Sequence, residues 1–311
     1  MRLDAYKSLW GVVSCDGGRH SLAEALSAAK AAGYVGVECS VRLALLLDSG
    51  DVPGHKQGGF SAGLRDHGLS WVPIAFSSGP VWRGWSPFPP DAAYKAVWSD
   101  SPARHAAALR EQLKVAVSLC CHTPFAVAHS GHDSWKVAQS VEFCGLALEA
   151  AQAEGFSLLH ETHRGRLTAN PWTLAAVAAQ LPSLRIVADY SHFTAACEVA
   201  MSENDEALEF ALGALAGHVD HIHARVGDEC RPQLDPRCSF SAVEVAAFEN
   251  AWRRIWQSQR QRGCTVSTFT PEYGPQPYSP PDCPVEEVED MNAWQCQRLR
   301  QCFEESNFKD V

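Results

Sequence analysis

Short apolar runs alternate along this chain with longer segments in which apolar residues recur at the spacing of a helix. The runs have the length of strands, and the segments between them have the length of helices. We expect strands at 9–13, 35–39, 70–76, 124–129 and 265–270, and in the apolar runs that end at Glu161, Asp189 and His223. We expect helices at 22–33, 61–67, 102–118, 137–154, 171–180, 205–215, 241–261 and 285–303.

Start and stop signals support several of these helices. Ser21 followed by Glu24 fits a capping box, and Gly33 fits the end of the same helix. Pro171 stands where a helix begins, because a first-turn residue needs no N–H donor. Residues 79–100 are rich in Pro, Trp and Gly, and we expect them to form an irregular loop over the mouth of the fold.

The alternation predicts eight strand–helix repeats of roughly thirty to forty residues each. This periodicity is typical of a (β/α)8 TIM barrel, an α/β fold with lid-like loops at the C-terminal face. An open doubly wound sheet is the main alternative, but it would not naturally bring the ends of the last four strands together. No internal linker interrupts the pattern, so we predict one domain over residues 1–311.

Composition narrows the functional classes. The hydrophobic content of 46% suffices for a large core, and no segment is apolar over the length that a bilayer requires. The formal charge of −10 argues against nucleic acid as the main partner, because binding phosphates requires a basic face. The first twenty residues carry charges around one short apolar run, which does not resemble a signal peptide.

The 12 cysteines are scattered and form no CxxC pair. A large cysteine-rich chain without a signal peptide is typical of a cytoplasmic protein with reduced thiols, and a disulfide framework is the less favoured interpretation. Cys120 with Cys121, and Cys296 with Cys302, are the pairs most open to oxidation in vitro.

Four apolar runs in the C-terminal half end in residues that bind metals: Glu161, Asp189, His223 and Glu272. In a parallel barrel the C-terminal ends of the strands meet at one mouth, so these four side chains could converge on one ion. Two glutamates, an aspartate and an imidazole suit Mn²⁺, Mg²⁺ or Co²⁺ better than a structural zinc, although Zn²⁺ stays open.

The chain resembles the xylose-isomerase-like superfamily, which contains sugar and sugar-phosphate isomerases and epimerases together with the endonuclease IV branch. The resemblance covers nearly the whole sequence, from GYVGVE at 33–38 to PEYG at 271–274. It implies that one divalent ion is held by Glu161, Asp189, His223 and Glu272, and that the two glutamates also serve as the acid–base pair. His192, three residues after Asp189, matches a substrate-contacting histidine.

The stretches HIHARVG at 221–227 and ETHRGR at 161–166 resemble a less characterised branch of the superfamily, which suggests no particular substrate. Within them, Arg225, His163 and Arg164 are candidates to hold substrate oxygens or a phosphate, with a structural salt bridge as an equal alternative for each.

Further candidates lie in the N-terminal half. Glu38 could touch substrate, although a buried ion pair is the safer interpretation, and His129 with His132 could extend a second metal site or line the mouth. A sugar-stacking wall could include Trp82 and Trp85, with Trp10 and Trp135 as further candidates, although packing in the core or a lid is the favoured interpretation for any one of them.

The proposed ligands also have structural interpretations. Glu161 could pair with Arg164 or Arg166, Asp189 could cap the next helix, and Glu272 could be a turn carboxylate. We also expect His221 and His223 to face opposite sides of their strand, one into the barrel and one towards the helices. The family motif favours His223 as the ligand.

The resemblance implies a metal-dependent isomerase or epimerase of a sugar or sugar derivative, in which a base removes the proton beside a carbonyl and the ion stabilises an enediolate. A lyase or dehydratase using the same enediolate is the alternative. An endonuclease is less favoured, because strand three ends without a histidine and no Asp-x-His follows strand seven. The expected partner is a small carbohydrate, with neither nucleic acid nor membrane, and a homodimer or homotetramer stays open.

Overall fold

Eight parallel strands form a closed barrel in the computed structural model, with neighbours in the order β1 to β8 and helices between the strands. The structure describes residues 1–50, 57–78 and 101–307. The predicted (β/α)8 fold is therefore confirmed. The chain also divides into two compact units, one formed mainly by residues 7–161 and the other mainly by residues 168–311 with the N-terminal six residues. The single-domain division stays a prediction.

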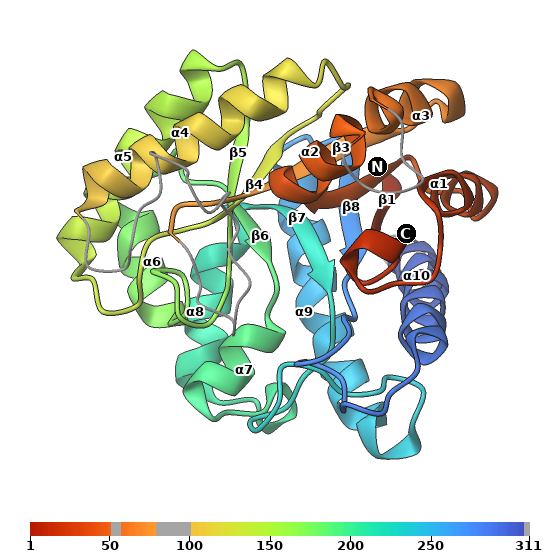
Figure 1. Cartoon of the computed structure of the whole chain (residues 1–311). Coiled ribbons are helices and arrows are strands. Elements are labelled where there is room, and N and C mark those ends of the chain that lie inside the picture. The colour runs from red at the N-terminus through yellow and green to blue at the C-terminus, as the bar shows by residue number, and fades with distance from the viewer. Residues whose placement is uncertain (51–56, 79–100, 308–311) are drawn as a thin grey trace. The chain divides into compact units, whose positions relative to one another are not determined.

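The first unit contains the strands β2 to β5 and their helices. Its elements are η1 (Ser14–Asp16), α1 (Leu22–Ala31), β2 (Gly36–Ser40), α2 (Val41–Ser49), α3 (Gly59–His67), β3 (Ser70–Phe76), α4 (Pro102–Ser118), β4 (Ala126–His129), α5 (Val137–Ala153) and β5 (Leu158–Glu161). The long helices α4 and α5 lie side by side in this unit (Figure 1).

The second unit contains most of β1 and the strands β6 to β8. Its elements are β1 (Arg2–Ser8), α6 (Pro171–Gln180), β6 (Ile186–Ala188), α7 (Ser191–Cys197), η2 (Met201–Glu203), α8 (Glu206–Ala216), β7 (Val219–Ala224), η3 (Ser239–Ser241), α9 (Ala242–Gln261), β8 (Val266–Pro271) and α10 (Val285–Asn307). Strand β8 pairs with both β1 and β7, and His223 of β7 stands in register with Thr270 of β8.

The first strand is where the sequence prediction was wrong. It spans Arg2–Ser8 rather than 9–13, and the buried apolar run after it forms a turn. Gly11 adopts a φ of 68°, which is outside the range of a strand, and the N–H of Val12 donates to the carbonyl of Leu9. The run 9–13 is thus apolar because it is buried, not because it is extended.

Helix α2 was not predicted, although its start signal is present in the sequence. Ser40 caps it by accepting a hydrogen bond from the N–H of Leu43, and Gly50 ends it in the left-handed conformation. The short helix α7 was also given no range from the sequence, and the helices that were predicted agree with the structure to within a few residues.

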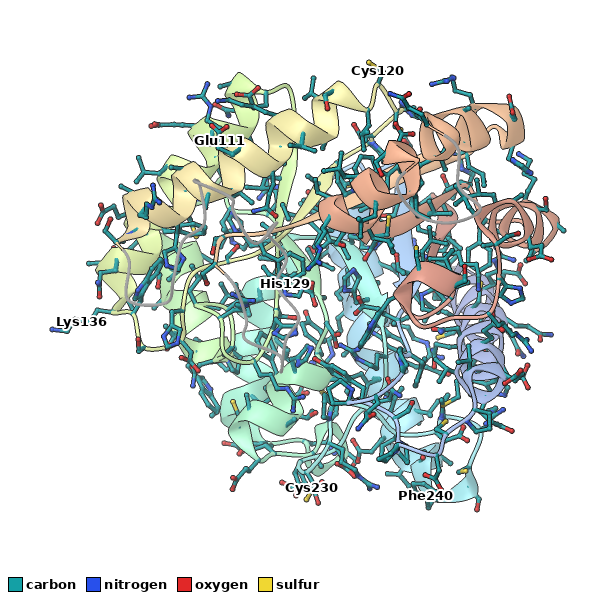
Figure 2. All side chains as sticks on the ribbon, in the orientation of Figure 1. Glu111, Cys120, His129, Lys136, Cys230 and Phe240 are labelled. Carbon is teal, nitrogen blue, oxygen red and sulfur yellow. The ribbon has the colours of Figure 1, made fainter. Side chains whose placement is uncertain are left out.

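The core of the second unit includes an apolar stripe along α9. Phe248, Trp252, Ile255 and Trp256 are fully buried at helical spacing, and each such side chain contributes about 1.5–3 kcal/mol on burial. No helix among the described residues is long and apolar enough to cross a membrane. The twelve cysteines are free thiols, and Cys120 and Cys230 lie exposed at the surface (Figure 2).

Candidate metal centre

Three predicted ligands come together at the C-terminal ends of consecutive strands in the second unit. Asp189 follows β6, His223 lies near the end of β7, and Glu272 follows β8. Their ligand atoms lie within 4.8 Å of one another, and Nδ1 of His223 is 3.1 Å from Oε2 of Glu272. All three residues are buried.

The carboxylate of Asp189 is fixed on both sides. Its Oδ1 accepts hydrogen bonds from the backbone N–H of Ser191 at 3.1 Å and from the Ser191 hydroxyl at 2.5 Å. Its Oδ2 forms an ion pair with Nη2 of Arg225. Thr162 holds the backbone, since its hydroxyl accepts from the N–H of Asp189 and donates to the carbonyl. Oδ1 thus binds the N–H of the first residue of α7, whereas the N-cap of that helix is Tyr190, which makes no side-chain capping bond.

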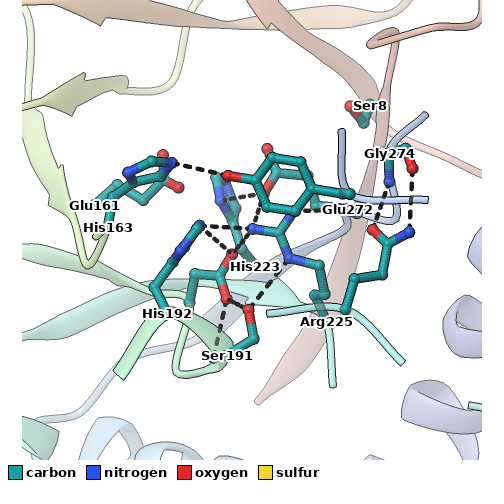
Figure 3. Close-up of polar contacts among 12 residues, drawn as sticks. Ser8, Glu161, His163, Ser191, His192, His223, Arg225, Glu272 and Gly274 are labelled. Carbon is teal, nitrogen blue, oxygen red and sulfur yellow. Dashed lines mark hydrogen bonds and ion pairs between the residues drawn. The ribbon is translucent and has the colours of Figure 1, made fainter. Parts of the chain in front are cut away.

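Arg225 is the cation of this cluster, and its guanidinium is almost fully buried. Nε donates to the Ser191 hydroxyl at 3.2 Å, and Nη1 donates to the backbone carbonyl of Glu272 at 3.0 Å (Figure 3). Nη2 binds Asp189 and lies 3.5 Å from Oε2 of Glu272. The structural salt bridge named as an alternative for Arg225 is therefore present, and its contact with substrate stays a prediction.

The hydrogen bonds assign tautomers to two histidines beside Arg225. A guanidinium only donates, so Nε2 of His192 accepts from Nη2 of Arg225 at 2.9 Å. Nδ1 of His163 lies 2.7 Å from the carbonyl of Arg164 and must donate to it, which leaves Nε2 of His163 as an acceptor. The two imidazole rings lie against each other with centroids 3.9 Å apart. Both histidines are therefore placed as acceptors through Nε2.

Tyr278 is a residue of this cluster that the sequence reasoning missed. Its hydroxyl lies 3.3 Å from Nε2 of His163 and donates to it, and its ring lies 4.7 Å from the guanidinium carbon of Arg225 and 5.1 Å from that of Arg164. Burial raises the pKa of the Tyr278 phenol to about 12, so the hydroxyl keeps its proton near neutral pH. An aromatic residue six positions after Glu272, in a Pro-rich segment, was the signal available in the sequence.

In the first unit, Glu161 ends β5 and is fully buried. Its Oε2 lies 2.8 Å from Nε2 of His129, at the end of β4, and the imidazole of His129 stacks on Phe76 at 4.4 Å. Arg166, one possible partner of Glu161, donates to the carbonyl and hydroxyl of Ser78. His129 is thus a partner of the proposed ligand Glu161.

The remaining candidates take varied places. Glu38 is fully buried in β2. His132 pairs locally with Asp133 and Ser134. Trp135 packs edge-on against His105 at 4.7 Å, which is the packing role considered for it. Trp82 and Trp85 lie outside the described residues.

The expectation that His221 and His223 face opposite sides is wrong. Residues two positions apart on a strand point to the same face, and the two ring centroids are 5.4 Å apart. His221 is held by two hydroxyls of β8, with Nδ1 2.7 Å from Thr268 and Nε2 3.0 Å from Thr270. Both ring nitrogens of buried His221 therefore lie within hydrogen-bonding distance of a hydroxyl. His223 is the histidine of this strand that lies beside Asp189 and Glu272.

Comparisons with known proteins identify the fold. No protein-family model and no curated protein matches the sequence. Among solved structures, the chain is similar to the probable 3-DHS dehydratase AsbF from Bacillus anthracis, with a TM-score of 0.54, 13% identity, and coverage of 96% of this chain and 99% of that one.

Two further solved structures are similar over the same length. One is the 3-keto-D-glucoside 4-epimerase YcjR from E. coli, with a TM-score of 0.55, 11% identity, and coverage of 95% of this chain and 100% of that one. The other is a xylose isomerase-like TIM barrel protein from Mycobacterium smegmatis in complex with magnesium, with a TM-score of 0.57, 12% identity, and coverage of 96% and 97%. These likenesses confirm the (β/α)8 barrel fold that the resemblance implies.

Proposed function

We propose that this chain, which has the fold of the xylose-isomerase-like TIM barrels, is a divalent-metal-dependent isomerase or epimerase of a sugar or sugar derivative. The observation that carries the proposal is the buried set of Asp189, His223 and Glu272 at the ends of three consecutive strands. Glu161 is proposed as the fourth ligand, because it ends the preceding strand and matches the family position.

The donors fit a small, hard divalent ion. Carboxylate oxygens with one imidazole suit Mg²⁺, Mn²⁺ or Co²⁺. Nδ1 of His223 and Oε2 of Glu272 lie 3.1 Å apart, so both atoms would be within reach of one bound ion.

The bound ion would polarise the substrate carbonyl and lower the energy of an adjacent enediolate. Glu272 and Glu161 would take the proton from the carbon beside that carbonyl and return it. If the proton returns to the opposite face of the same carbon, that stereocentre is inverted, which is epimerisation. If one base instead carries the proton along one face to the neighbouring carbon, the carbonyl moves, which is isomerisation. The one lone pair on Nε2 of His192 accepts from Nη2 of Arg225, so His192 would act on the substrate by positioning that guanidinium.

The dehydratase among the similar structures supports elimination as a second candidate reaction. The same proton abstraction would start it, and loss of a β-leaving group would replace return of the proton. Analysis of products separates the two, because elimination releases water or alcohol and isomerisation conserves mass.

The test is a screen of aldoses, ketoses and keto-glycosides with added Mn²⁺ in D₂O, with C–H exchange followed by NMR. We expect exchange with at least one class, and its loss in both Glu161→Gln and Glu272→Gln while circular dichroism stays unchanged. Glu154→Gln is the matched control. Glu154 lies at the end of α5, outside the proposed site, and pairs with Arg110 of α4. Exchange that persists in both glutamine variants would remove these carboxylates from the mechanism.

A further inference from the structure

The chain directly after Glu272 is held by the side-chain amides of Asn292 and Gln233, which we call the clamps. Asn292 of α10 accepts from the N–H of Tyr273 through Oδ1 and donates to the carbonyl of Tyr273 through Nδ2, both at 2.8 Å. Gln233 accepts from the N–H of Gly274 at 2.9 Å and donates to its carbonyl at 3.1 Å. Side chains thus satisfy both backbone polar groups of two consecutive residues.

Other contacts make this arrangement rigid. The phenol of Tyr273 is fully buried, accepts from the N–H of Val226 at 3.1 Å and donates to Gln295 at 3.2 Å. The Ser279 hydroxyl donates to the carbonyl of Gly274 at 2.8 Å and accepts from Nε2 of Gln233 at 2.8 Å. Buried amides in such a network lose a great deal when one partner is removed, because the other stays desolvated and unpaired.

The two amides bind the backbone just beyond the end of β8, where pairing with a neighbouring strand no longer holds it. Glu272 lies between the last residue of β8, Pro271, and the first clamped residue, Tyr273. The direction of its carboxylate therefore depends on the backbone of the residues that Asn292 and Gln233 hold. Both clamps come from elsewhere in the chain, one from α10 and one from the segment between β7 and α9.

We propose that Asn292 and Gln233 are positioning residues that aim the Glu272 carboxylate at the metal site. This inference rests on the proposed function, because it requires Glu272 to be a ligand. The competing interpretation is that the two amides only stabilise the fold. The two interpretations differ in whether loss of a clamp weakens metal binding beyond the loss of stability.

Gln259 of α9 provides the matched control. It is buried, and its Nε2 donates to the carbonyl of Val219 at 3.2 Å. Val219 is the first residue of β7, so this amide holds the opposite end of the strand that carries His223. Gln259→Ala therefore removes a buried amide of the same kind away from the site.

The experiment measures Mn²⁺ dissociation constants by titration calorimetry and thermal midpoints for the parent, Asn292→Ala, Gln233→Ala and Gln259→Ala in the full chain. We expect each clamp variant to weaken Mn²⁺ binding about 10- to 100-fold, the range for residues that orient metal ligands, and Gln259→Ala to leave it unchanged. If Asn292→Ala does not fold, Asn292→Asp is measured in its place, because the aspartate keeps an acceptor for the N–H of Tyr273.

A double-mutant cycle with Glu272→Gln adds a readout that a purely structural role would not move. If Asn292 acts through Glu272, the Mn²⁺ affinity of the double variant will match that of Glu272→Gln alone. Additive losses, or affinities that follow the thermal midpoints across all three alanine variants, would overturn the inference while the metal site stands. A parent that binds no Mn²⁺ would overturn the proposed function and this inference with it.

Discussion

Replacing Arg225 by methionine tests the electrostatics of the candidate site most directly. The guanidinium binds Asp189 and lies 3.5 Å from the carboxylate of Glu272, and its side chain is 2% exposed. Methionine keeps much of the length and apolar volume of the side chain but removes the charge. Without the cation, two carboxylates stay buried beside each other.

The magnitude follows from the burial of both partners. Removing one member of a buried ion pair costs about 3–5 kcal/mol, because an uncompensated charge remains. With an unfolding entropy of about 2.1 cal/mol/K per residue over the 311 residues, this cost lowers the thermal midpoint by roughly 5–8 °C. The ion pair between half-exposed Arg110 and partly buried Glu154 provides the control, and Arg110→Met is expected to cost below about 1 kcal/mol.

The assay is thermal unfolding with EDTA and then with Mn²⁺. A divalent cation among these carboxylates would supply the positive charge that Arg225→Met lacks. We therefore expect Mn²⁺ to raise the midpoint of Arg225→Met by more than it raises the midpoint of the parent. A midpoint of Arg225→Met in EDTA that matches that of Arg110→Met would refute the reasoning, because the buried pair would then be worth no more than an exposed one.

Three further outcomes are expected. First, His223→Ala reduces the metal that stays bound after dialysis. The control is His218→Ala, since His218 binds the carbonyl of Leu184, and it leaves the metal content unchanged. Equal metal contents of the two variants in elemental analysis would count against ligation by His223. Second, Tyr278→Phe lowers the free energy of unfolding in urea by about 1 kcal/mol, because it removes the hydrogen bond to His163. Tyr278→Leu lowers it by about 0.5–2 kcal/mol more, because it also removes the ring that lies on Arg225. Equal losses in the two variants would exclude the ring contact. Burial lowers the pKa of His160 from 6.5 to about 4, so the unfolded chain binds a proton that the folded chain refuses, and stability falls by about 3 kcal/mol between pH 7 and pH 4. His160→Gln should remove that part of the acid sensitivity, and an unchanged pH profile of unfolding would contradict this origin.

Much of the fold was predictable because its signals are local. Helix α4 was predicted with its observed bounds, since Ser101 caps it and Pro102 occupies its first turn. The first strand was not, because an apolar run records burial and not extension, and the turn at Gly11 depends on a positive φ that the run itself does not encode. Helix α2 follows β2 without a loop, so its apolar residues continue the run of the strand, and the start signal at Ser40 falls inside that run.

The places of the proposed ligands at the ends of strands were also predictable, since a polar residue directly after an apolar run marks the C-terminal end of a buried strand. The residues that support those ligands were not. Tyr278 and Asn292 act through contacts across 115 and 19 residues of sequence, and Ser191 acts through a local turn, so each looks ordinary where it stands. The His221 interpretation failed for another reason, because strand geometry itself places residues two apart on one face.

Register explains why the proposed ligands need support beyond the ends of their strands. Adjacent parallel strands stand about 4.8 Å apart, so side chains from β6, β7 and β8 reach one point without distortion when their registers agree. A shift of one residue at the end of β8 would turn Glu272 to the other face. The ladder fixes register only up to Ala224 and Pro271. Beyond that pair, the contacts of Asn292 and Gln233 with the next two residues continue the constraint, which is why we expect metal affinity to depend on amides that touch no ligand atom.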